Sequence, residues 1–126
     1  MKALVRRAKV LLYTPDHENR QIYKKIFENA GCTVCELQPQ DFGTRTADLA
    51  TGKTDNTGDS FSPNEAFAVF CFCTSSQLDR ILRALRVPGV PPLPLKASMT
   101  PNNSTWTLQK LYEEVCSEHK LMHAQA

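Results

Sequence analysis

Two short runs in this chain constrain its fold most, because both are apolar on two faces. Residues 8–13 read AKVLLY and residues 67–73 read FAVFCFC. Each run has the length of a strand and lacks a regular alternation of apolar and polar side chains. Strands of this kind lie inside a sheet that is covered on both faces. The sequence therefore predicts a sheet with these two strands at its centre.

Weaker patterns predict two further strands and three helices. Residues 32–37 are typical of a short mixed strand, and residues 93–99 alternate apolar and polar side chains as an edge strand does. Three stretches repeat apolar side chains at helical spacing between capping and breaking residues, namely residues 15–30, 75–87 and 103–122. The expected order is β-α-β, a loop, then β-α-β-α.

This order is typical of a ferredoxin-like sheet. We expect an α/β (α+β) fold, a β-α-β-β-α-β sheet in strand order 4-1-3-2, with a C-terminal helix added. A doubly wound sheet is the alternative, but the weak second strand argues against it. The sheet face turned away from the first two helices needs a cover, which the third helix, a second subunit or a ligand would supply.

The stretch between the second and third strands differs in composition from the rest. Residues 43–64 hold five threonines and three of the five glycines but few large apolar side chains. Apart from a turn of helix at residues 47–50, such a stretch buries too little to order itself. We expect a single domain over residues 1–126 with a mobile loop at about 43–64, cut by proteases after Arg45 or Lys53.

Length and charge exclude several function classes. The chain has 126 residues and a formal net charge of +2, which is too small to favour nucleic acid or membrane surfaces as partners. The apolar run at residues 10–13 is too short for a signal peptide, and no stretch is long enough to span a membrane. Five cysteines, an odd number, favour reduced thiols. We expect a cytoplasmic protein.

Cysteines and histidines suggest metal or redox chemistry, but the pattern does not support it. Cys32 and Cys35 form a C-x-x-C that follows a helix, whereas a redox pair sits at a helix N-terminus. A four-cysteine zinc site with Cys71 and Cys73 has no spacing that enforces it. Weak metal candidates lie on one face of the last helix, namely Cys116, His119 and His123. We expect buried, inert thiols, no metal and no cofactor.

Aromatic residues on the central strands resemble an RNA-binding surface. Tyr13, Phe70 and Phe72 match the stacking positions of such sheets, but the accompanying basic and glycine residues are missing. Motifs of hydrolases, nucleotide-binding loops and metalloproteases are absent from the sequence as well. Tyr13, Phe70 and Phe72 are therefore interpreted as core residues.

The best candidate site is the junction between the last strand and the last helix, residues 96–106, which read KASMTPNNSTW. Thr100 and Asn103 bring hydrogen-bonding groups to an expected helix N-terminus, where free N–H groups suit an anion. Lys96 would add charge and Trp106 a flat wall. The alternative is that these residues only cap the helix and fill the core.

The same segment is similar to a known family. Residues 96–107 fit a K-A-x-x-T-P-x-N-x-x-W-T pattern, and Leu111, Glu114 and Glu118-His119 follow on the helix. The similarity extends toward the N-terminus through Phe70-Cys71 to Ser75, Leu78-Asp79 and Leu82. This resembles a bacterial domain-of-unknown-function family, numbered thirty-seven eighty-three. The resemblance implies a small α/β module of unassigned activity.

We therefore expect a non-catalytic binding or assembly module, a homodimer that pairs through the second face of the sheet. The alternative is a sensor of a small molecule or anion at the 96–106 junction. An enzyme is the third reading. Nucleic acid and membrane are not expected as partners.

Overall fold

The computed structural model describes residues 8–52, 61 and 63–124. Seven main elements follow the predicted order: β1 (Lys9–Tyr13), α1 (His17–Asn29), β2 (Thr33–Glu36), β3 (Phe67–Cys71), α3 (Ser75–Leu85), β4 (Leu95–Ser98) and α4 (Leu108–Ala124). Three short elements are also present. The 3₁₀ turns η1 (Pro39–Gly43) and η2 (Asn103–Thr105) were not predicted, whereas the short helix α2 (Thr46–Ala50) corresponds to the turn of helix expected at residues 47–50.

Short polar side chains start the first two helices. The Asp16 carboxylate accepts the Glu18 N–H at 2.9 Å and so caps α1, which ends before Gly31 at φ +90°. Thr74 starts α3 with a capping box, because its hydroxyl accepts the Gln77 N–H while the Gln77 side chain accepts the Thr74 N–H. These caps fix where each helix meets the sheet.

The strand order is β2-β1-β3-β4, so the predicted order 4-1-3-2 is wrong and a ferredoxin-like sheet is not confirmed. β1 and β3 are central, as predicted, and pair antiparallel; β2 runs parallel to β1, and β4 parallel to β3. The predicted order needs β2 beside β3, which a hairpin would supply. Residues 37–66 instead include η1 and α2, which pack below the sheet, so β2 pairs with β1.

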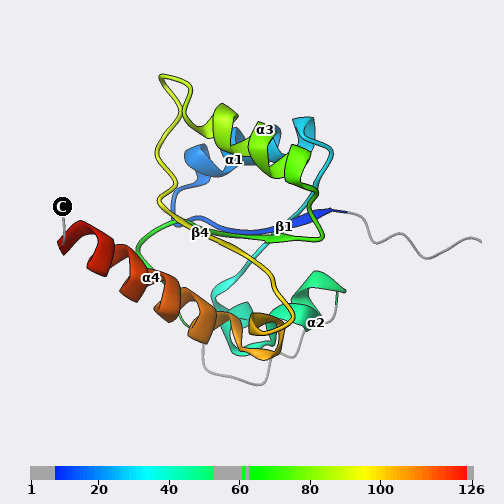
Figure 1. Ribbon diagram of the computed structural model, residues 1–126, viewed down its shortest axis with the longest axis vertical. Helices are drawn as coiled ribbons and strands as arrows, with labels where there is room; N and C mark the ends of the chain where they lie inside the picture. The colour runs from blue at the N-terminus through cyan, green and yellow to red at the C-terminus, as the bar shows by residue number, and fades with distance from the viewer. Residues whose placement is uncertain (1–7, 53–60, 62, 125–126) are drawn as a thin grey trace, which may run out of the picture.

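The sheet separates two layers of helices (Figure 1). Above it, α1 and α3 bury a cluster around Val10, Phe27 and Ile81. Below it, α4, α2 and η1 bury a second cluster around Leu11, Phe42 and Leu108. The second face, where we expected a dimer to pair, is therefore covered by the chain's own helices.

The predicted loop at 43–64 is ordered at its start. Thr44, Thr46 and Leu49 are buried, and the Thr46 N–H donates to the Trp106 carbonyl at 2.9 Å. Arg45 forms a β-bridge with Thr107. The Thr46 hydroxyl also donates to the Trp106 carbonyl, and the Leu108 N–H donates to the Thr44 carbonyl. Composition alone does not predict these contacts with the start of α4. Lys53 and most of the later loop lie outside the described residues.

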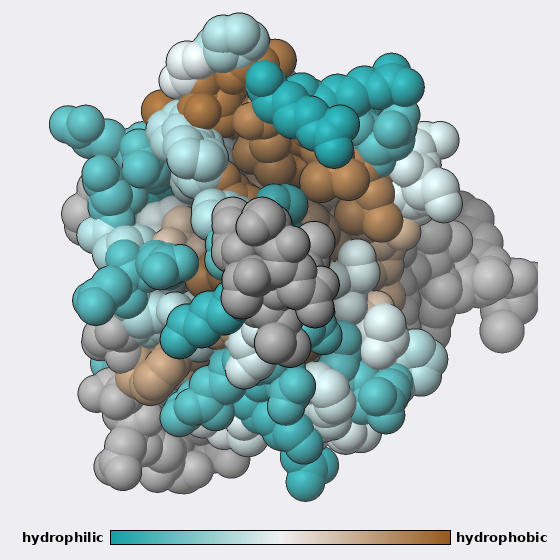
Figure 2. All heavy atoms as spheres, turned by 60° about the vertical axis from the view of Figure 1, so that its left-hand side comes forward, coloured by the Kyte–Doolittle hydropathy of each residue, from teal (hydrophilic) through white to brown (hydrophobic). Residues whose placement is uncertain are grey.

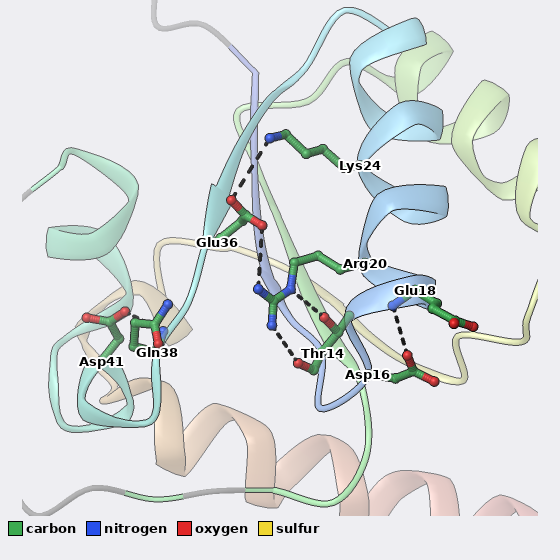
Figure 3. A network of polar contacts seen from close by, with 8 residues as sticks. All are labelled: Thr14, Asp16, Glu18, Arg20, Lys24, Glu36, Gln38 and Asp41. Atoms are coloured by element: carbon green, nitrogen blue, oxygen red, sulfur yellow. Dashed lines mark hydrogen bonds and ion pairs between the residues drawn. The ribbon is translucent and has the colours of Figure 1, made fainter.

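Polar contacts attach α1 to β1 and β2 (Figure 3). The Arg20 guanidinium donates to the hydroxyl and carbonyl of Thr14 at 2.8 and 3.0 Å and lies 3.7 Å from the Glu36 carboxylate. Lys24 lies 3.9 Å from the same carboxylate. These contacts lie at the β2 edge of the sheet, opposite the β4 edge.

Candidate functional site

Phe72 interrupts the third strand. Sequence analysis predicted a strand to Cys73, but β3 ends at Cys71, and Phe72 takes a left-handed conformation with φ +59°. Bulky residues rarely adopt this conformation, and such strain is common near functional sites. The turn places Phe72 with Cys71 on the lower, α4 side of the sheet, and Cys73 on the upper side. The regular strand thus stops at Cys71, which leaves an opening beside the carboxyl end of β3.

A cavity of about 420 Å³ lies at this opening. Four segments of the chain surround the cavity: the end of β3, the first turns of α3, the segment that follows β4, and α2. Its lining consists of Ala47, Thr51, Phe70, Phe72, Cys73, Leu78, Ser98, Met99, Thr100, Pro101 and Ser104. Because β3 and β4 are parallel, their carboxyl ends meet at one edge, where ligands bind in many α/β proteins.

The lining is apolar with a few hydroxyls and no charged side chain. The Thr51 and Ser104 hydroxyls donate to backbone carbonyls, while the Thr100 hydroxyl accepts the Asn103 N–H and keeps its own proton for donation. Cys73 contributes a thiol whose pKa burial raises to about 12. The cavity therefore suits a neutral ligand.

Thr100 and Asn103, both predicted site residues, bind each other. The Thr100 N–H donates to Asn103 Oδ1 at 2.8 Å, and the Asn103 N–H donates to the Thr100 hydroxyl at 3.1 Å. Asn103 Nδ2 also donates to the Ser98 carbonyl. This reciprocal pair closes the turn at residues 100–103 that leads into η2, and Thr100 additionally lines the cavity.

The last helix starts later than predicted. α4 begins at Leu108, and the Thr107 hydroxyl accepts the Lys110 N–H at 3.2 Å. The start expected near Asn103 is therefore wrong, because residues 103–105 form their own short turn. The free N–H groups of α4 are not at Thr100 and Asn103, which removes the physical reason for an anion site there.

Lys96 and Trp106 lie on different sides of the sheet. The Lys96 ammonium donates to the Leu93 carbonyl, back along the chain and away from Thr100. Trp106 packs against the lower cluster, and Lys110 Nζ lies 4.7 Å from its ring centre. The structure therefore brings Thr100 and Asn103 together but leaves Lys96 and Trp106 apart from them.

The cysteines form pairs that their spacing does not predict. Cys32 Sγ lies 3.9 Å from Cys73 Sγ in the upper layer, whereas Cys35 and Cys71 belong to the lower one. The sheet thus divides the C-x-x-C and the four-cysteine set into two pairs. Burial raises the pKa of Cys32 as well, and that of Cys71 to about 12.

The weak metal candidates on the last helix are not gathered into a site in the described part of the chain. Cys116 packs against the lower cluster, and His119 is half-buried; the side chain of His123 lies outside the described residues. No group of three or more metal-ligating side chains occurs in the described part of the chain. Tyr13 and Phe70 are buried, as predicted for core residues. No helix in this part is long and apolar enough to cross a membrane.

Most of the cavity lining lies outside the segment that the sequence marks as a candidate site. That segment contributes Ser98, Thr100 and Ser104, whereas Ala47, Phe72, Cys73 and Leu78 come from elsewhere. No motif marks these four positions. The signal that could have found them is topological, because a parallel pair formed by the third and fourth strands brings the segments after both strands to one place.

Comparison with known proteins identifies one similarity. Residues 66–122 match the model of a family described as a domain of unknown function (DUF3783), which supports the resemblance seen in the sequence. The matched segment contains β3, α3, β4 and η2, and thus every cavity-lining residue except those of the α2 region. Neither the curated proteins nor the solved structures give a match.

Proposed function

We propose that this protein is a non-catalytic binding module and that its ligand occupies the cavity at the carboxyl ends of β3 and β4. The observation that carries the proposal is the cavity itself. Its volume of about 420 Å³ is in the range of small-molecule sites, and the left-handed Phe72 stands in its wall. A preformed hollow beside a strained residue favours binding over a purely structural role.

The ligand is a small, neutral and mainly apolar molecule. Phe70, Phe72 and Met99 supply apolar surface, and Thr100 supplies a hydroxyl donor. A charged ligand would lose its hydration without gaining an opposite charge, because no lining residue is charged. This ligand class replaces the anion expected from the sequence.

A non-catalytic role is favoured by the chemistry of the lining. Its one thiol is that of Cys73, and a pKa raised to about 12 leaves little thiolate at neutral pH. No histidine or carboxylate lines the cavity to act as a general base. The five cysteines, all free in the structure, support a reducing compartment such as the cytoplasm.

The test is thermal unfolding in the presence of neutral probes and of charged probes that carry the same ring. Indole and cyclohexanol are expected to raise Tm, whereas indole-3-acetate and cyclohexanecarboxylate are not. A ligand that binds only the folded state at 100 times its Kd stabilises it by about 2.7 kcal/mol. If no neutral probe raises Tm, the proposal is wrong.

Two variants test whether the probe binds inside the cavity. Ala47 lies in the cavity wall, so Ala47→Leu is expected to fill the space and to abolish the gain in Tm. Ala84 on α3 is also half-buried but does not line the cavity, so Ala84→Leu is expected to retain the gain. Equal gains in both variants would place the probe elsewhere.

A further inference from the structure

The edge of β4 is open in the described part of the chain. β4 is the last strand in the order β2-β1-β3-β4, and its one strand partner is β3. An open edge exposes unpaired backbone groups and is the surface to which extended peptides add as strands. The surroundings of this edge therefore decide whether it has a partner.

The register shows which backbone groups point outward. In a parallel pair, alternate residues direct their N–H and C=O groups to opposite sides. The Met99 N–H donates to the Phe70 carbonyl, so Met99 and Ala97 face β3, while Lys96 and Ser98 face the open edge. The Ser98 carbonyl is already bound by the Asn103 amide. The N–H groups of Lys96 and Ser98 and the Lys96 carbonyl remain to pair with a further strand.

An apolar groove runs beside this edge. Two hollows of about 220 and 190 Å³ lie between α3 and β4 and share Leu82 and Lys96. Leu78 and Leu85 line them as well, and all three leucines are only half-buried. Figure 2 shows hydrophobic side chains gathered in the upper half of the molecule, the half that holds α3 in Figure 1, with hydrophilic side chains bordering them.

The groove carries positive charge without a matching negative one. Lys96 and Arg86 both line the hollow near Leu85, and neither hollow has an acidic residue in its lining. Burial, and then the neighbouring Arg86, lower the pKa of Lys96. Asp79, the one acidic residue of α3, is paired with Arg83 at 2.9 Å. An acidic group in the groove would relieve the repulsion between the two cations.

We propose that the β4 edge and the adjoining groove bind an extended, acidic segment of a partner protein, which adds to the sheet as a further strand. Backbone pairing with Lys96 and Ser98 holds the segment, alternate apolar side chains contact the leucines of α3, and a carboxylate faces Lys96 and Arg86. This surface adjoins the cavity and shares Leu78 and Ser98 with its wall, whereas Lys96 and Arg86 lie outside the cavity lining. Variants of these two cations therefore test peptide binding apart from the ligand proposed for the cavity, and either proposal can fail alone.

A second copy of the chain fits the edge less well. Two β4 strands paired edge to edge would bring Lys96 and Arg86 of both copies to the same groove. Like charges that face each other across an interface disfavour that partner. The charge of the groove therefore selects an acidic strand over self-association.

The test uses a blocked peptide, acetyl-Glu-Thr-Val-Thr-Val-amide, labelled for fluorescence anisotropy. We expect it to bind the full chain and to slow hydrogen exchange of the Lys96 and Ser98 amides. Arg86→Gln and Lys96→Gln are each expected to weaken binding by about threefold to fivefold, as for a partly exposed ion pair. Lys110→Gln removes a cation on the other side of the sheet and is expected to have no effect.

Two further peptides test the strand pairing. One is methylated on the central valine nitrogen and the other on a neighbouring threonine nitrogen. Because a strand pairs along one edge through alternate residues, one of them is expected to lose binding and the other to keep it. Equal affinity of the two peptides overturns the proposal. So does a peptide-free dimer, detected by sedimentation, in which the Lys96 and Ser98 amides are already protected.

Discussion

Cys32 and Cys73 have their sulfur atoms 3.9 Å apart, although 41 positions separate them in the chain. The positive φ of Phe72 produces this contact, because it turns Cys73 toward the upper layer where Cys32 is buried. The same turn opens the cavity whose wall contains Phe72 and Cys73. One strained residue thus connects the thiol pair with the candidate ligand site.

The thiol pair predicts which disulfide forms under oxidation. Treatment with oxidised glutathione is expected to link Cys32 to Cys73, because Cys35 lies on the other side of the sheet. The reaction is expected to be slow at pH 7 and faster at pH 9, since burial raises the pKa of both thiols and limits the thiolate. Peptide mapping by mass spectrometry identifies the bond. Cys35→Ser should leave it intact, and a bond between Cys32 and Cys35 would contradict the structure.

The strain at Phe72 predicts an unusual order of stability. Phe72→Gly and Phe72→Ala both remove the ring, but only glycine adopts φ +59° without penalty. The glycine variant is therefore expected to be more stable than the alanine variant by about 1 kcal/mol, measured by urea unfolding. At ordinary positions the alanine variant is the more stable one, and that order here would show that Phe72 is not strained.

Asn103 is predicted to act as a brace for the turn η2. Asn103→Ala removes the acceptor for the Thr100 N–H and the donor to the Ser98 carbonyl, and is expected to cost about 0.5–2 kcal/mol. Asn103→Asp keeps the acceptor and should cost less. Millimolar phosphate is expected to leave Tm unchanged, since Lys96 is turned toward Leu93. A rise in Tm with phosphate that vanishes in Lys96→Ala would restore the anion site.

The packing around α2 predicts resistance to proteolysis after Arg45. The Arg45 carbonyl accepts the N–H groups of Asp48 and Leu49, and the residue also bridges Thr107. A protease needs an extended chain, so trypsin is expected to spare this bond in the folded protein and to cut it in urea-unfolded protein. Mass spectrometry of early fragments checks this. Rapid cleavage after Arg45 without denaturant would show that α2 is not packed.

The sequence predicted those parts of the fold that depend on local pattern. The two apolar runs identified β1 and β3 as central strands, and apolar spacing located α1 and α3. The predicted strand order was wrong because the order depends on the path of the chain between β2 and β3. Thr44 and Thr46 are typical of loop residues in the sequence, but in the structure they are buried and hydrogen-bond to residues at the start of α4.

The candidate site was predicted only in part, for a similar reason. Thr100 was identified from its hydrogen-bonding character, and it does line the cavity. Phe72 was assigned to a continuous strand, because a left-handed residue within an apolar run leaves no signal in the sequence. Ala47 reaches the cavity from α2, a contact that follows from tertiary packing alone.

The most direct measurement of the central claim uses Met99, which lines the cavity. The chain has three methionines, so the ¹H–¹³C methyl spectrum of protein labelled at methionine is simple to assign. Titration with indole is expected to shift the Met99 methyl signal in a saturable manner in the wild type and in Ala84→Leu, but not in Ala47→Leu. A Met99 signal that stays in place while indole raises Tm, or that shifts equally in Ala47→Leu, would contradict a ligand site in this cavity.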